Sequence, residues 1–332
     1  MTVYLKHFLL PSDDAEYALF TSPTAQMTCY ETCYPYGLFK GRVPRLDFAP
    51  ITILYGGNGS GKTTILNAIA RKLNLAGISE ERERLPFFDT YASDCSAILN
   101  QEESIPEESR LIASDDVFRF IFQTRAANRT IEKKRKISIA DYWDKKNSRF
   151  QVQTLSDVEH LQEYADAHHK TVSRFVRHRV ESNRKERSNG ENAFRYFVEA
   201  IQENGLYLLD EPENSLSAGH QLNLLSYLEN SVRLGVQLII ATHSPLLLSL
   251  REARIYDLDD TPVRIKPWQD LENVRIFYDF FQSKASFFQT RSDSDTKKRE
   301  SHKIPSTAEP PEPKHRKRKN KREENEFQLP LF

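Results

Sequence analysis

The sequence is poor in cysteine and has no long apolar run. Its three cysteines, Cys29, Cys33 and Cys95, provide neither an even set for a disulfide framework nor four zinc ligands. Cys29 and Cys33 are four positions apart, which leaves a metal-binding pair as the alternative to the free thiols that we expect. The first residues lack the basic and then apolar pattern of a secretion signal, and no segment reaches the ~20 apolar residues of a membrane span. These absences predict a cytoplasmic protein without membrane contact.

The sequence also lacks net charge, because Lys and Arg total 47 and Asp and Glu also total 47. The balance is uneven along the chain. Residues 284–332 contain 13 Lys and Arg against 8 Asp and Glu, which makes this segment +5 and the rest of the chain −5. Any attraction for nucleic acid must therefore come from local patches and not from the field of the whole molecule.

A glycine-rich segment, GGNGSGKTT at residues 56–64, follows directly after the apolar run Ile51–Tyr55. It matches the phosphate-loop pattern G-x-x-x-x-G-K-[ST] in the strand–loop–helix context that the motif requires. In such a loop, backbone N–H groups surround a β-phosphate, a lysine reaches the β and γ oxygens, and a hydroxyl ligates Mg²⁺. The following helix adds the positive end of its dipole. We therefore expect ATP and Mg²⁺ to be bound by Gly56, Gly57, Asn58, Gly59, Ser60, Gly61, Lys62, Thr63 and Thr64, with Lys62 on the phosphates and Thr63 on the metal.

A second apolar run, Leu206–Leu209, ends in Asp210, Glu211, Pro212 and Glu213. Four consecutive apolar residues indicate a strand buried on both faces, as in a parallel sheet covered by helices. Carboxylates at the carboxyl end of such a strand lie where open α/β sheets bind ligands. Asp210 is expected to hold Mg²⁺ through its water shell. Glu211 is the expected general base for the water that attacks the γ-phosphate; the alternative is an ordinary acidic turn.

Two further segments gain meaning from their spacing. The apolar run Val236–Ala241 ends in Thr242 and His243, and a histidine at the carboxyl edge of a strand can donate to a γ-phosphate. The segment SNGE at residues 188–191 opens a helical pattern, and a serine hydroxyl with a glycine at a helix N-terminus makes an anion site. Taken alone, the histidine would be structural and SNGE a plain helix cap. SNGE begins 22 residues before Asp210 and His243 follows 33 residues after it, and this order favours a shared site.

The order phosphate loop, S-x-G-E, apolar-D-E-P and T-H resembles the ATPase head of the ATP-binding-cassette family. Because SNGE ends in a glutamate, it resembles the corresponding motif of SMC- and RecF-like members more than that of transporters. This resemblance implies a homodimer that closes over two ATP molecules. Ser188 and Gly190 of one subunit would then face the γ-phosphate held by Lys62 of the other, and Glu191 is expected with them among the ATP-binding residues.

The family pattern is incomplete in three places. Asn189 stands where the usual motif has glycine, and Ser217 where the dimer-contact loop often has aspartate. Gln101 and Gln123 are both candidates for the family's glutamine. Asn189 and Ser217 weaken the support for the dimer geometry, and the glutamine is the part of the resemblance that the sequence supports least.

A narrower resemblance covers about residues 1–282 and rests on SRLIASDDVF (109–118), SNGENAFRYF (188–197) and LDEPENSL (209–216). These segments resemble the compact PtuA-type ATPases of Septu and retron-associated antiphage (antiviral) defence. The resemblance implies a partner HNH nuclease of the PtuB-like kind. In retron systems it also implies a reverse transcriptase with its RNA–DNA hybrid.

Two functions follow as hypotheses. The first is an ATPase, converting ATP and water to ADP and phosphate, that acts as a dimeric switch of an antiphage defence system and regulates the partner nuclease. The alternative is an SMC- or RecF-like ATPase of DNA repair or replication that docks on the sliding clamp. A transporter ATPase is disfavoured by the acidic end of SNGE and by the basic helical insertion.

We expect an α/β fold of the P-loop ATPase head type, with a mixed or parallel sheet, N-terminal antiparallel strands, a helical lobe and a disordered C-terminal tail. Tyr34 and Tyr36 are candidates for stacking on adenine or for core packing. In the lobe we expect a break near residues 138–140 and no long coiled coil, because sustained heptads are absent. The expected divisions are 1–114 for the first part of the core, 115–187 for the lobe, 188–282 for the second part and 283–332 for the tail; the first part should contain strands near 3–5, 8–10, 37–39 and 46–48.

Four features in the second half of the chain suggest partners. The basic helix expected at 170–187 and the run 314–322 suit phosphate backbones, with a solvated face as the alternative for each. Aromatic residues between Trp268 and Phe281 recur at helical spacing and indicate core or a partner interface. The last residues, Gln328–Phe332 (QLPLF), resemble the pentapeptide with which bacterial proteins dock on the sliding clamp; the alternative is an intramolecular dock or a contact with the nuclease.

Overall fold

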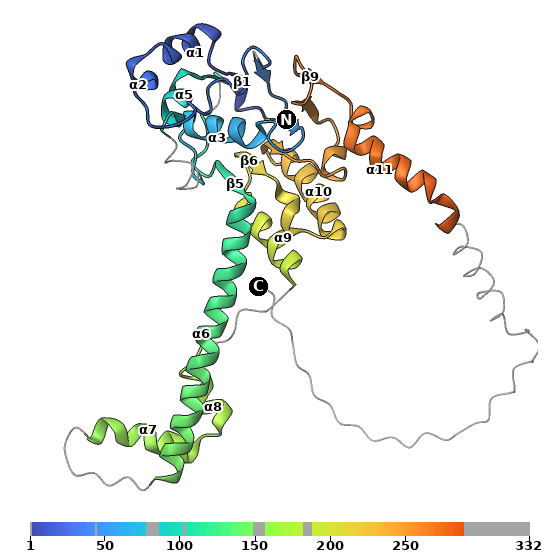
Figure 1. Cartoon of the computed structure of the whole chain (residues 1–332). Helices are drawn as coiled ribbons and strands as arrows, with labels where there is room; N and C mark the ends of the chain where they lie inside the picture. The colour runs from blue at the N-terminus through green and yellow to red at the C-terminus, as the bar shows by residue number, and fades with distance from the viewer. Residues whose placement is uncertain are drawn as a thin grey trace, which may run out of the picture. The chain divides into compact units, whose positions relative to one another are not determined.

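The computed structural model describes residues 2–43, 45–77, 86–101, 104–148, 157–181 and 188–288. It divides the chain into one unit that ends at Tyr278 and a second that begins at Asp279. The first unit contains the sheets and the helical lobe (Figure 1). The expected disordered tail therefore lies almost entirely outside the described residues. No helix among the described residues is long and apolar enough to cross a membrane.

A six-stranded sheet forms the centre of this unit, in the order β5-β6-β7-β3-β8-β9. The first five strands are parallel to their neighbours, and β9 pairs antiparallel with β8. Parallel pairing places the carboxyl ends of β3, β6 and β7 at one edge of the sheet. The strands are β3 (Ile51–Tyr55), β5 (Arg110–Ala113), β6 (Leu206–Asp210), β7 (Gln237–Ala241), β8 (Arg254–Asp257) and β9 (Arg264–Ile265).

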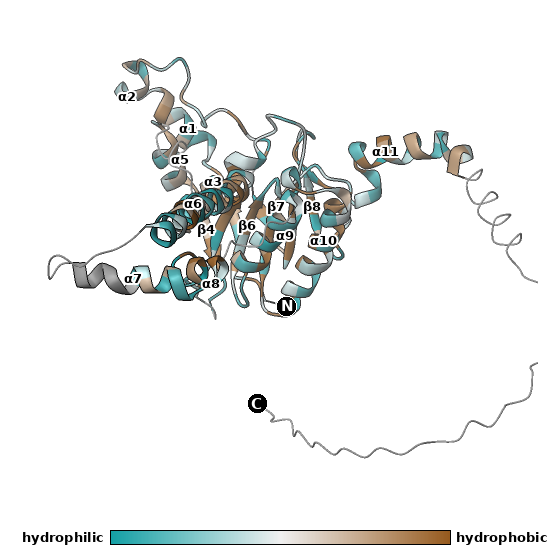
Figure 2. Cartoon of the chain, turned by 90° about the horizontal axis from the view of Figure 1, so that it is seen from below, coloured by the Kyte–Doolittle hydropathy of each residue, from teal (hydrophilic) through white to brown (hydrophobic). Residues whose placement is uncertain are grey.

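Both faces of this sheet are buried, and successive residues alternate between two cores. Leu54 and Leu208 face the core formed with α3 (Lys62–Lys72), whereas Ile53 and Tyr207 face the core formed with α9 (Asn189–Ala200) and α10 (Ala218–Arg233). Figure 2 shows the hydrophobic strands with α3 on one side and α9 and α10 on the other. The uninterrupted apolar runs of the sequence thus follow from burial on both faces. The expected α/β fold of the P-loop head type is confirmed.

A second sheet of three antiparallel strands, in the order β2-β1-β4, precedes and flanks the core. Its strands are β1 (Leu5–Leu9), β2 (Leu46–Asp47) and β4 (Ser96–Leu99). The expected strand at 37–39 is wrong, since these residues form turns, and the third strand comes from beyond the phosphate loop. Helices α1 (Asp13–Phe20) and α2 (Pro23–Gln26) also fill the region that the sequence analysis read as strands and turns. Ser12 and Ser22 cap these helices through their hydroxyls.

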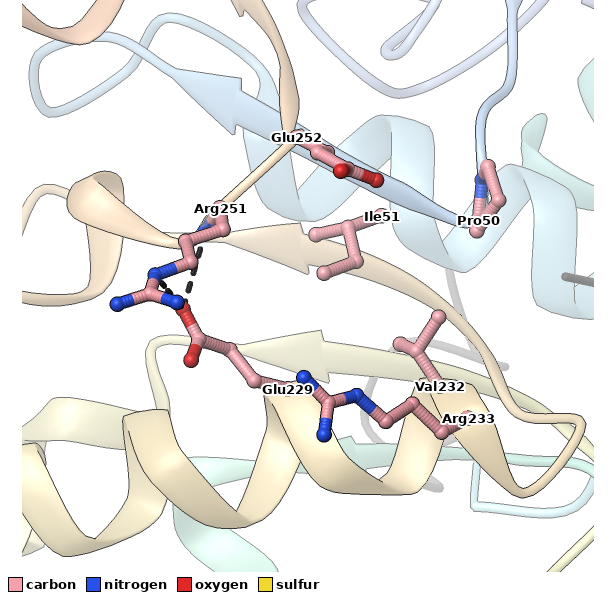
Figure 3. A pocket seen from close by; sticks show the side chains of 7 residues that line it. All are labelled: Pro50, Ile51, Glu229, Val232, Arg233, Arg251 and Glu252. Carbon is pink, nitrogen blue, oxygen red and sulfur yellow. Dashed lines mark hydrogen bonds and ion pairs between the residues drawn. The ribbon is translucent and has the colours of Figure 1, made fainter.

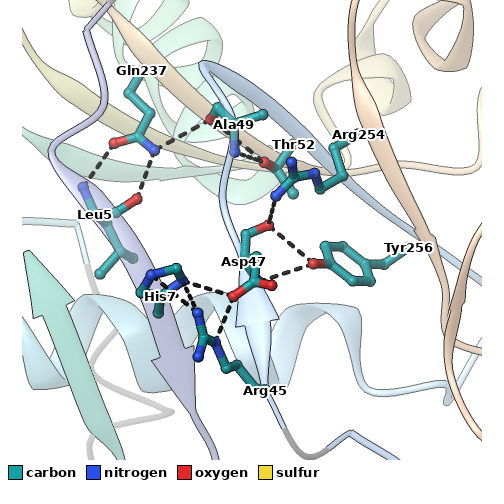
Figure 4. Close-up of polar contacts among 9 residues, drawn as sticks. All are labelled: Leu5, His7, Arg45, Asp47, Ala49, Thr52, Gln237, Arg254 and Tyr256. Atoms are coloured by element: carbon teal, nitrogen blue, oxygen red, sulfur yellow. Dashed lines mark hydrogen bonds and ion pairs between the residues drawn. The ribbon is translucent and has the colours of Figure 1, made fainter.

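Gln237 fastens the N-terminal sheet to the central sheet (Figure 4). Its side chain is fully buried, and its Oε1 accepts hydrogen bonds from the backbone N–H groups of Tyr4 and Leu5 at 2.8 and 2.9 Å. Its Nε2 donates to the carbonyl of Leu5 at 2.9 Å and to that of Ala49 at 3.3 Å. One amide of β7 therefore satisfies backbone groups of two other segments, at Tyr4–Leu5 and at Ala49.

The helical lobe is built on α6 (Ser114–Asn147), a single helix of 34 residues and thus about 50 Å long. The break expected near 138–140 is wrong, because these residues lie inside α6. Ser138 is buried there, and Ile139 packs against the small core of Tyr142, Phe175 and Val176. This tertiary contact outweighs the weak helix propensity of the serine. The other helices of the lobe, α7 (Asp157–His169) and α8 (Val172–Arg177), pack against α6 (Figure 1).

The remaining elements complete the two cores. Helix α5 (Phe88–Asp94) packs against α3. Short 3-10 turns follow β6, β7 and β9: η1 (Pro212–Ser215), η2 (Leu247–Ser249) and η3 (Trp268–Asp270). The last described helix is α11 (Glu272–Ser283). Leu271 and Val274 belong to the core, whereas Phe277 and Phe281 are exposed, so the aromatic pattern near 268–281 divides between core and surface.

Replacement of Gln237 should test the link between the sheets. Gln237→Leu keeps the approximate size but leaves the N–H groups of Tyr4 and Leu5 buried without an acceptor, so we expect a loss of about 3 kcal/mol in the free energy of unfolding. Urea unfolding followed by circular dichroism measures this quantity. Gln202→Leu at an exposed position is the control and should change it by less than about 0.5 kcal/mol. Equal, small effects of both variants would contradict the assigned role.

Candidate functional site

The phosphate loop lies between β3 and α3, at the carboxyl edge of the parallel strands. Gly61 directly precedes α3 and has a φ of 97°, a left-handed conformation that side chains disfavour. A Cβ at this position would lie 2.4 Å from the ring of Phe39. The buried aromatic ring therefore packs against the loop backbone, and only glycine permits this approach.

Lys62, the first residue of α3, is only 4% exposed. Its Nζ donates to the backbone carbonyls of Gly56 at 2.7 Å and Gly57 at 2.9 Å, and it forms no ion pair with any described residue. Burial of an ammonium group is costly when its direct partners are neutral carbonyl groups and not a carboxylate. The loop therefore presents a buried positive charge that suits an anionic ligand.

Thr63 and Asp210 meet across the sheet edge. The Thr63 hydroxyl donates to Oδ1 of Asp210 at 2.8 Å, and Asp210 is the last residue of β6 and 5% exposed. A hydroxyl beside a carboxylate is a pair of hard oxygen donors, which suits Mg²⁺. Magnesium sites of this class use one or two protein ligands together with phosphate oxygens, and no cluster of three or more acidic, His or Cys side chains able to hold a metal occurs among the described residues. The residues present thus fit a nucleotide-bound magnesium ion.

Glu211 follows Asp210 with a φ of 49°, which is unusual for a residue other than glycine. Its backbone N–H donates to the carbonyl of Ala241 at the end of β7, and its Oε2 accepts from Nδ2 of Asn214 at 2.8 Å. Its Oε1 lies 3.8 Å from Nδ1 of His243. Strained backbone of this kind concentrates at functional sites. The structure thus brings Glu211 and His243 together as the sequence spacing suggested.

The loop that carries His243 is held by a residue that sequence reasoning missed. Oε1 of Glu213 accepts hydrogen bonds from the Thr242 hydroxyl at 2.6 Å and from the N–H groups of His243 and Ser244 at 3.1 and 3.2 Å. Glu213 is 7% exposed. The signal was present in the sequence, because a second glutamate after Asp210, Glu211 and Pro212 has no role in a simple acidic turn.

SNGE lies at the N-terminus of α9, where Ser188 is the cap. The Ser188 hydroxyl accepts from the N–H of Glu191 at 3.3 Å, and the Glu191 carboxylate accepts from the N–H of Ser188 at 3.0 Å. This capping box confirms the helix that SNGE was expected to open. A Cβ on Gly190 would lie 2.8 Å from Nδ1 of His220, so glycine is required by the neighbouring ring. Among described residues, these hydrogen bonds join SNGE to none of Gly56–Thr64.

The two tyrosines considered for the adenine ring have different surroundings. Tyr36 is buried, donates to Oδ2 of Asp94 at 2.6 Å and packs edge-on against Tyr91, and burial raises the pKa of its hydroxyl. It is a core residue. Tyr34 is 40% exposed, and its hydroxyl lies 2.5 Å from Oγ1 of Thr64 in the first turn of α3. Tyr34 is therefore the one of the two that adjoins the loop.

The glutamine and the dimer-contact residue stay predictions. Gln101 and Gln123 are both exposed. Ser217, which precedes α10, pairs its Oγ with Nδ1 of His220 at 2.8 Å.

The three cysteines form no disulfide with one another. Cys29, Cys33 and Cys95 are free thiols. Burial raises the pKa of the Cys95 thiol to about 12, so this sulfur stays protonated and is a poor nucleophile at neutral pH.

The basic helix is shorter than expected. Helix α8 ends at Arg177, so a continuous helix to 187 is wrong, while residues 182–187 lie outside the described part. Lys170 pairs with Asp166, and Arg179 pairs with Asp141 and stacks over Phe175. Part of this charge is thus engaged inside the lobe. The segments 314–322 and Gln328–Phe332 also lie outside the described residues.

A cavity of about 170 Å³ lies beside the amino end of β3, at the edge of the sheet opposite the phosphate loop. It is lined by Pro50, Glu229, Arg233 and Arg251 among others, and Arg251 contacts Glu229 (Figure 3). Because every candidate residue for phosphate chemistry is at the other edge, this cavity is not part of the site.

Comparison with protein families agrees with a phosphate-binding loop at this edge of the sheet. The family model described as an AAA domain matches residues 36–326, which is most of the chain. The chain belongs to the AAA domain family. The match of this family extends over the phosphate loop, the Asp210–Glu211 pair and the His243 loop, so all three lie within one AAA domain. Among curated proteins, none matches the chain.

Solved structures similar to this AAA domain include two SMC heads. One is titled an SmcHead bound to the C-winged helix domain of ScpA, with 14% identity, a TM-score of 0.41 and coverage of 80% of this chain and 97% of that one. The other is an Smc head with an extended coiled coil from Pyrococcus furiosus, with 13% identity, a TM-score of 0.41 and coverage of 80% and 96%. A metal-chelate type ABC transporter has 17% identity, a TM-score of 0.32 and coverage of 69% and 76%. These overall similarities are low, and the fold assignment rests on the sheet order and the loop geometry above.

The approach of Phe39 to Gly61 gives a test of the loop. Gly61→Ala adds a Cβ that clashes with this ring and disfavours the left-handed backbone, so we expect ATP binding to weaken at least about tenfold, or ~1.4 kcal/mol. Titration with a fluorescent ATP analogue measures the change. Gly219→Ala in α10, where nothing lies within 4 Å of the added Cβ, is the matched control. It should leave binding unchanged and, if anything, stabilise the helix by up to about 1 kcal/mol.

Proposed function

We propose that the protein is an ATPase whose two copies close over two ATP molecules and open again after hydrolysis. The observation that supports this most is the convergence of the buried Lys62, whose direct partners are carbonyl groups, with the Thr63–Asp210 pair and Glu211 at one edge of the sheet. A binding module without catalysis would have no need of Glu211 in a strained conformation beside His243.

Phosphate binding is assigned to the loop and the first turn of α3. Backbone N–H groups of the loop and the helix dipole hold the β-phosphate. Lys62 exchanges its carbonyl partners for β and γ oxygens, and this relieves the cost of its buried charge. Thr63 and Asp210 hold Mg²⁺, which when bound neutralises charge on the β and γ oxygens. Tyr34, next to Thr64, is placed to contact the base.

Hydrolysis is assigned to Glu211 and His243. Glu211 accepts a hydrogen bond from the attacking water and orients it, while Asn214 fixes one of its carboxylate oxygens. His243, 43% exposed at the side chain, donates to the γ-phosphate and so distinguishes ATP from ADP. Ser188 and Gly190 of a second copy complete the site from the N-terminus of α9. The intact capping box leaves the Ser188 hydroxyl hydrogen free to donate to this phosphate.

Substitution of the general base should separate binding from turnover. Glu211→Gln keeps the size and the contact to Asn214 but cannot accept the proton of the water, so we expect ATP affinity within about twofold of the wild type and kcat lower by about 10²–10³-fold. Phosphate release measures turnover, and light scattering after gel filtration with ATP should detect dimers that accumulate. Wild-type turnover would remove Glu211 from the mechanism.

Two controls sharpen this experiment. Glu203→Gln at an exposed position should leave turnover unchanged. Ser188→Arg combined with Glu211→Gln should prevent the dimer while each copy still binds ATP, because the arginine blocks the face that a second copy offers. A dimer that forms equally well in the double variant would contradict the composite site.

At the finer level we propose an antiphage role of the Septu or retron type, supported by the resemblance of residues 109–118, 188–197 and 209–216 to PtuA-type ATPases. The partner is then an HNH nuclease, with nucleic acid contacted by basic residues of the lobe and by the segment 314–322. The segment Gln328–Phe332 favours the second candidate, a repair or replication ATPase on the sliding clamp.

Co-expression distinguishes the two candidates. After co-expression with a PtuB-like HNH nuclease, we expect a stable complex. A mass measurement of the purified complex gives its composition, and its nuclease activity should change with ATP. Capture of purified sliding clamp, lost on Leu331→Ala with Phe332→Ala, together with no nuclease complex, would instead favour the second candidate.

A further inference from the structure

The backbone N–H and the backbone carbonyl of His243 are both held by side chains from other elements. On one side, its N–H donates to the buried Glu213 of η1 at 3.1 Å. On the other side, its carbonyl accepts from Nδ2 of Asn273, in the first turn of α11, at 2.5 Å. The imidazole itself is 43% exposed. Its position is therefore set through the backbone and not by close packing of the ring.

Glu213 is suited to hold this loop in one position. Three donors converge on its Oε1, from Thr242, His243 and Ser244, and its Oε2 has no hydrogen-bond partner among the described residues. A buried carboxylate that depends on so few donors is destabilised by any movement that removes them. Displacement of the histidine loop would thus leave a buried charge without its donors. These hydrogen bonds therefore hold the loop of His243 in one position.

Asn273 connects the same loop to the phosphate loop. Its backbone N–H donates to the hydroxyl of Tyr55 at 3.1 Å, while its side chain holds the carbonyl of His243. Tyr55 ends β3 and immediately precedes Gly56. A second contact runs in parallel, because Nε1 of Trp268 donates to the carbonyl of Pro245 at 3.0 Å. The first turn of α11 therefore spans the end of β3 and the histidine loop.

We propose that Asn273 and Glu213 are positioning residues for His243, and that they fix the distance between the histidine and the phosphate loop at which a γ-phosphate is contacted. The proposal rests on the function proposed above and adds two residues that the phosphate, metal and water roles do not use. It also makes the start of α11 part of the nucleotide-sensing apparatus. Loss of either contact lets the histidine loop shift while the phosphate loop stays intact, so turnover falls and ATP binding does not.

A double-mutant cycle tests this. Asn273→Ala should lower kcat at least about tenfold and change ATP affinity by less than about twofold, with binding measured by fluorescent analogue and turnover by phosphate release. In a His243→Ala background, assayed in single turnover with radiolabelled ATP, the same substitution should cause no further loss, because its effect passes through the histidine. Asn223→Ala, at an exposed position of α10, is the matched control and should change neither quantity.

If the losses of turnover caused by Asn273→Ala and His243→Ala are additive, or if Asn273→Ala lowers ATP affinity and kcat equally, Asn273 has a structural role and the proposal is overturned. Glu213→Gln is the second variant, since it keeps the size and one accepting oxygen. It should retain ATP affinity and melting temperature, lower kcat, and likewise have no effect without His243. Full turnover in Glu213→Gln and Asn273→Ala would also overturn the proposal.

Failure of the underlying function gives a different result. If His243→Ala retains wild-type kcat, or if Lys62→Ala hydrolyses ATP normally, the proposed ATPase site itself is wrong. If those two variants lose activity and Asn273→Ala does not, only the positioning role is wrong.

Discussion

The hydrogen bond between the Thr63 hydroxyl and the Asp210 carboxylate joins segments 147 residues apart. It can form only because the strands that precede these two residues end at the same edge of the sheet, and the rest of the site depends on this arrangement. Parallel strands β3 and β6 must end at the same sheet edge, with β7 between them. Only this order brings the phosphate loop, the acidic pair and the histidine loop together. Burial of both faces fixes the register, because a slip of one residue would exchange the two cores on either side of the sheet.

Strand β7, which lies between β6 and β3 in the sheet, has polar contacts at both of its ends. Gln237 begins β7 and bonds the N-terminal sheet, whereas Ala241 ends β7 and receives the N–H of Glu211. One strand thus positions both the N-terminal sheet and the backbone of Glu211. Phe39, which lies in the turns at residues 37–39, packs against Gly61. The N-terminal segment therefore shapes the loop although it contributes no phosphate ligand.

Much of this could be predicted from the sequence, because local signals and burial agree there. The apolar runs ending in Tyr55, Asp210 and Ala241 are strands since both faces are covered, and the loop motif fixes its own geometry. The third strand of the N-terminal sheet could not be predicted, since β4 is paired by contacts distant in sequence. The unbroken α6 was missed because Ile139, next to the buried Ser138, packs against Phe175 and Val176 of α8, which are distant in sequence. Glu213 and Asn273 were missed because their partners lie 30 residues away.

The strand order also gives the helical lobe a direct connection to the site. Ala113 ends β5 and is paired with Asp210 across the sheet, and α6 begins at the next residue. Near its start, Arg125 of α6 donates to the side chain of Asn189 at the N-terminus of α9. One helix about 50 Å long therefore has contacts with both the strand that ends in the acidic pair and the segment SNGE. Helices α7 and α8 pack against the same helix farther along, around Ile139 and Tyr142, so α6 alone connects the small core of the lobe to both of these segments.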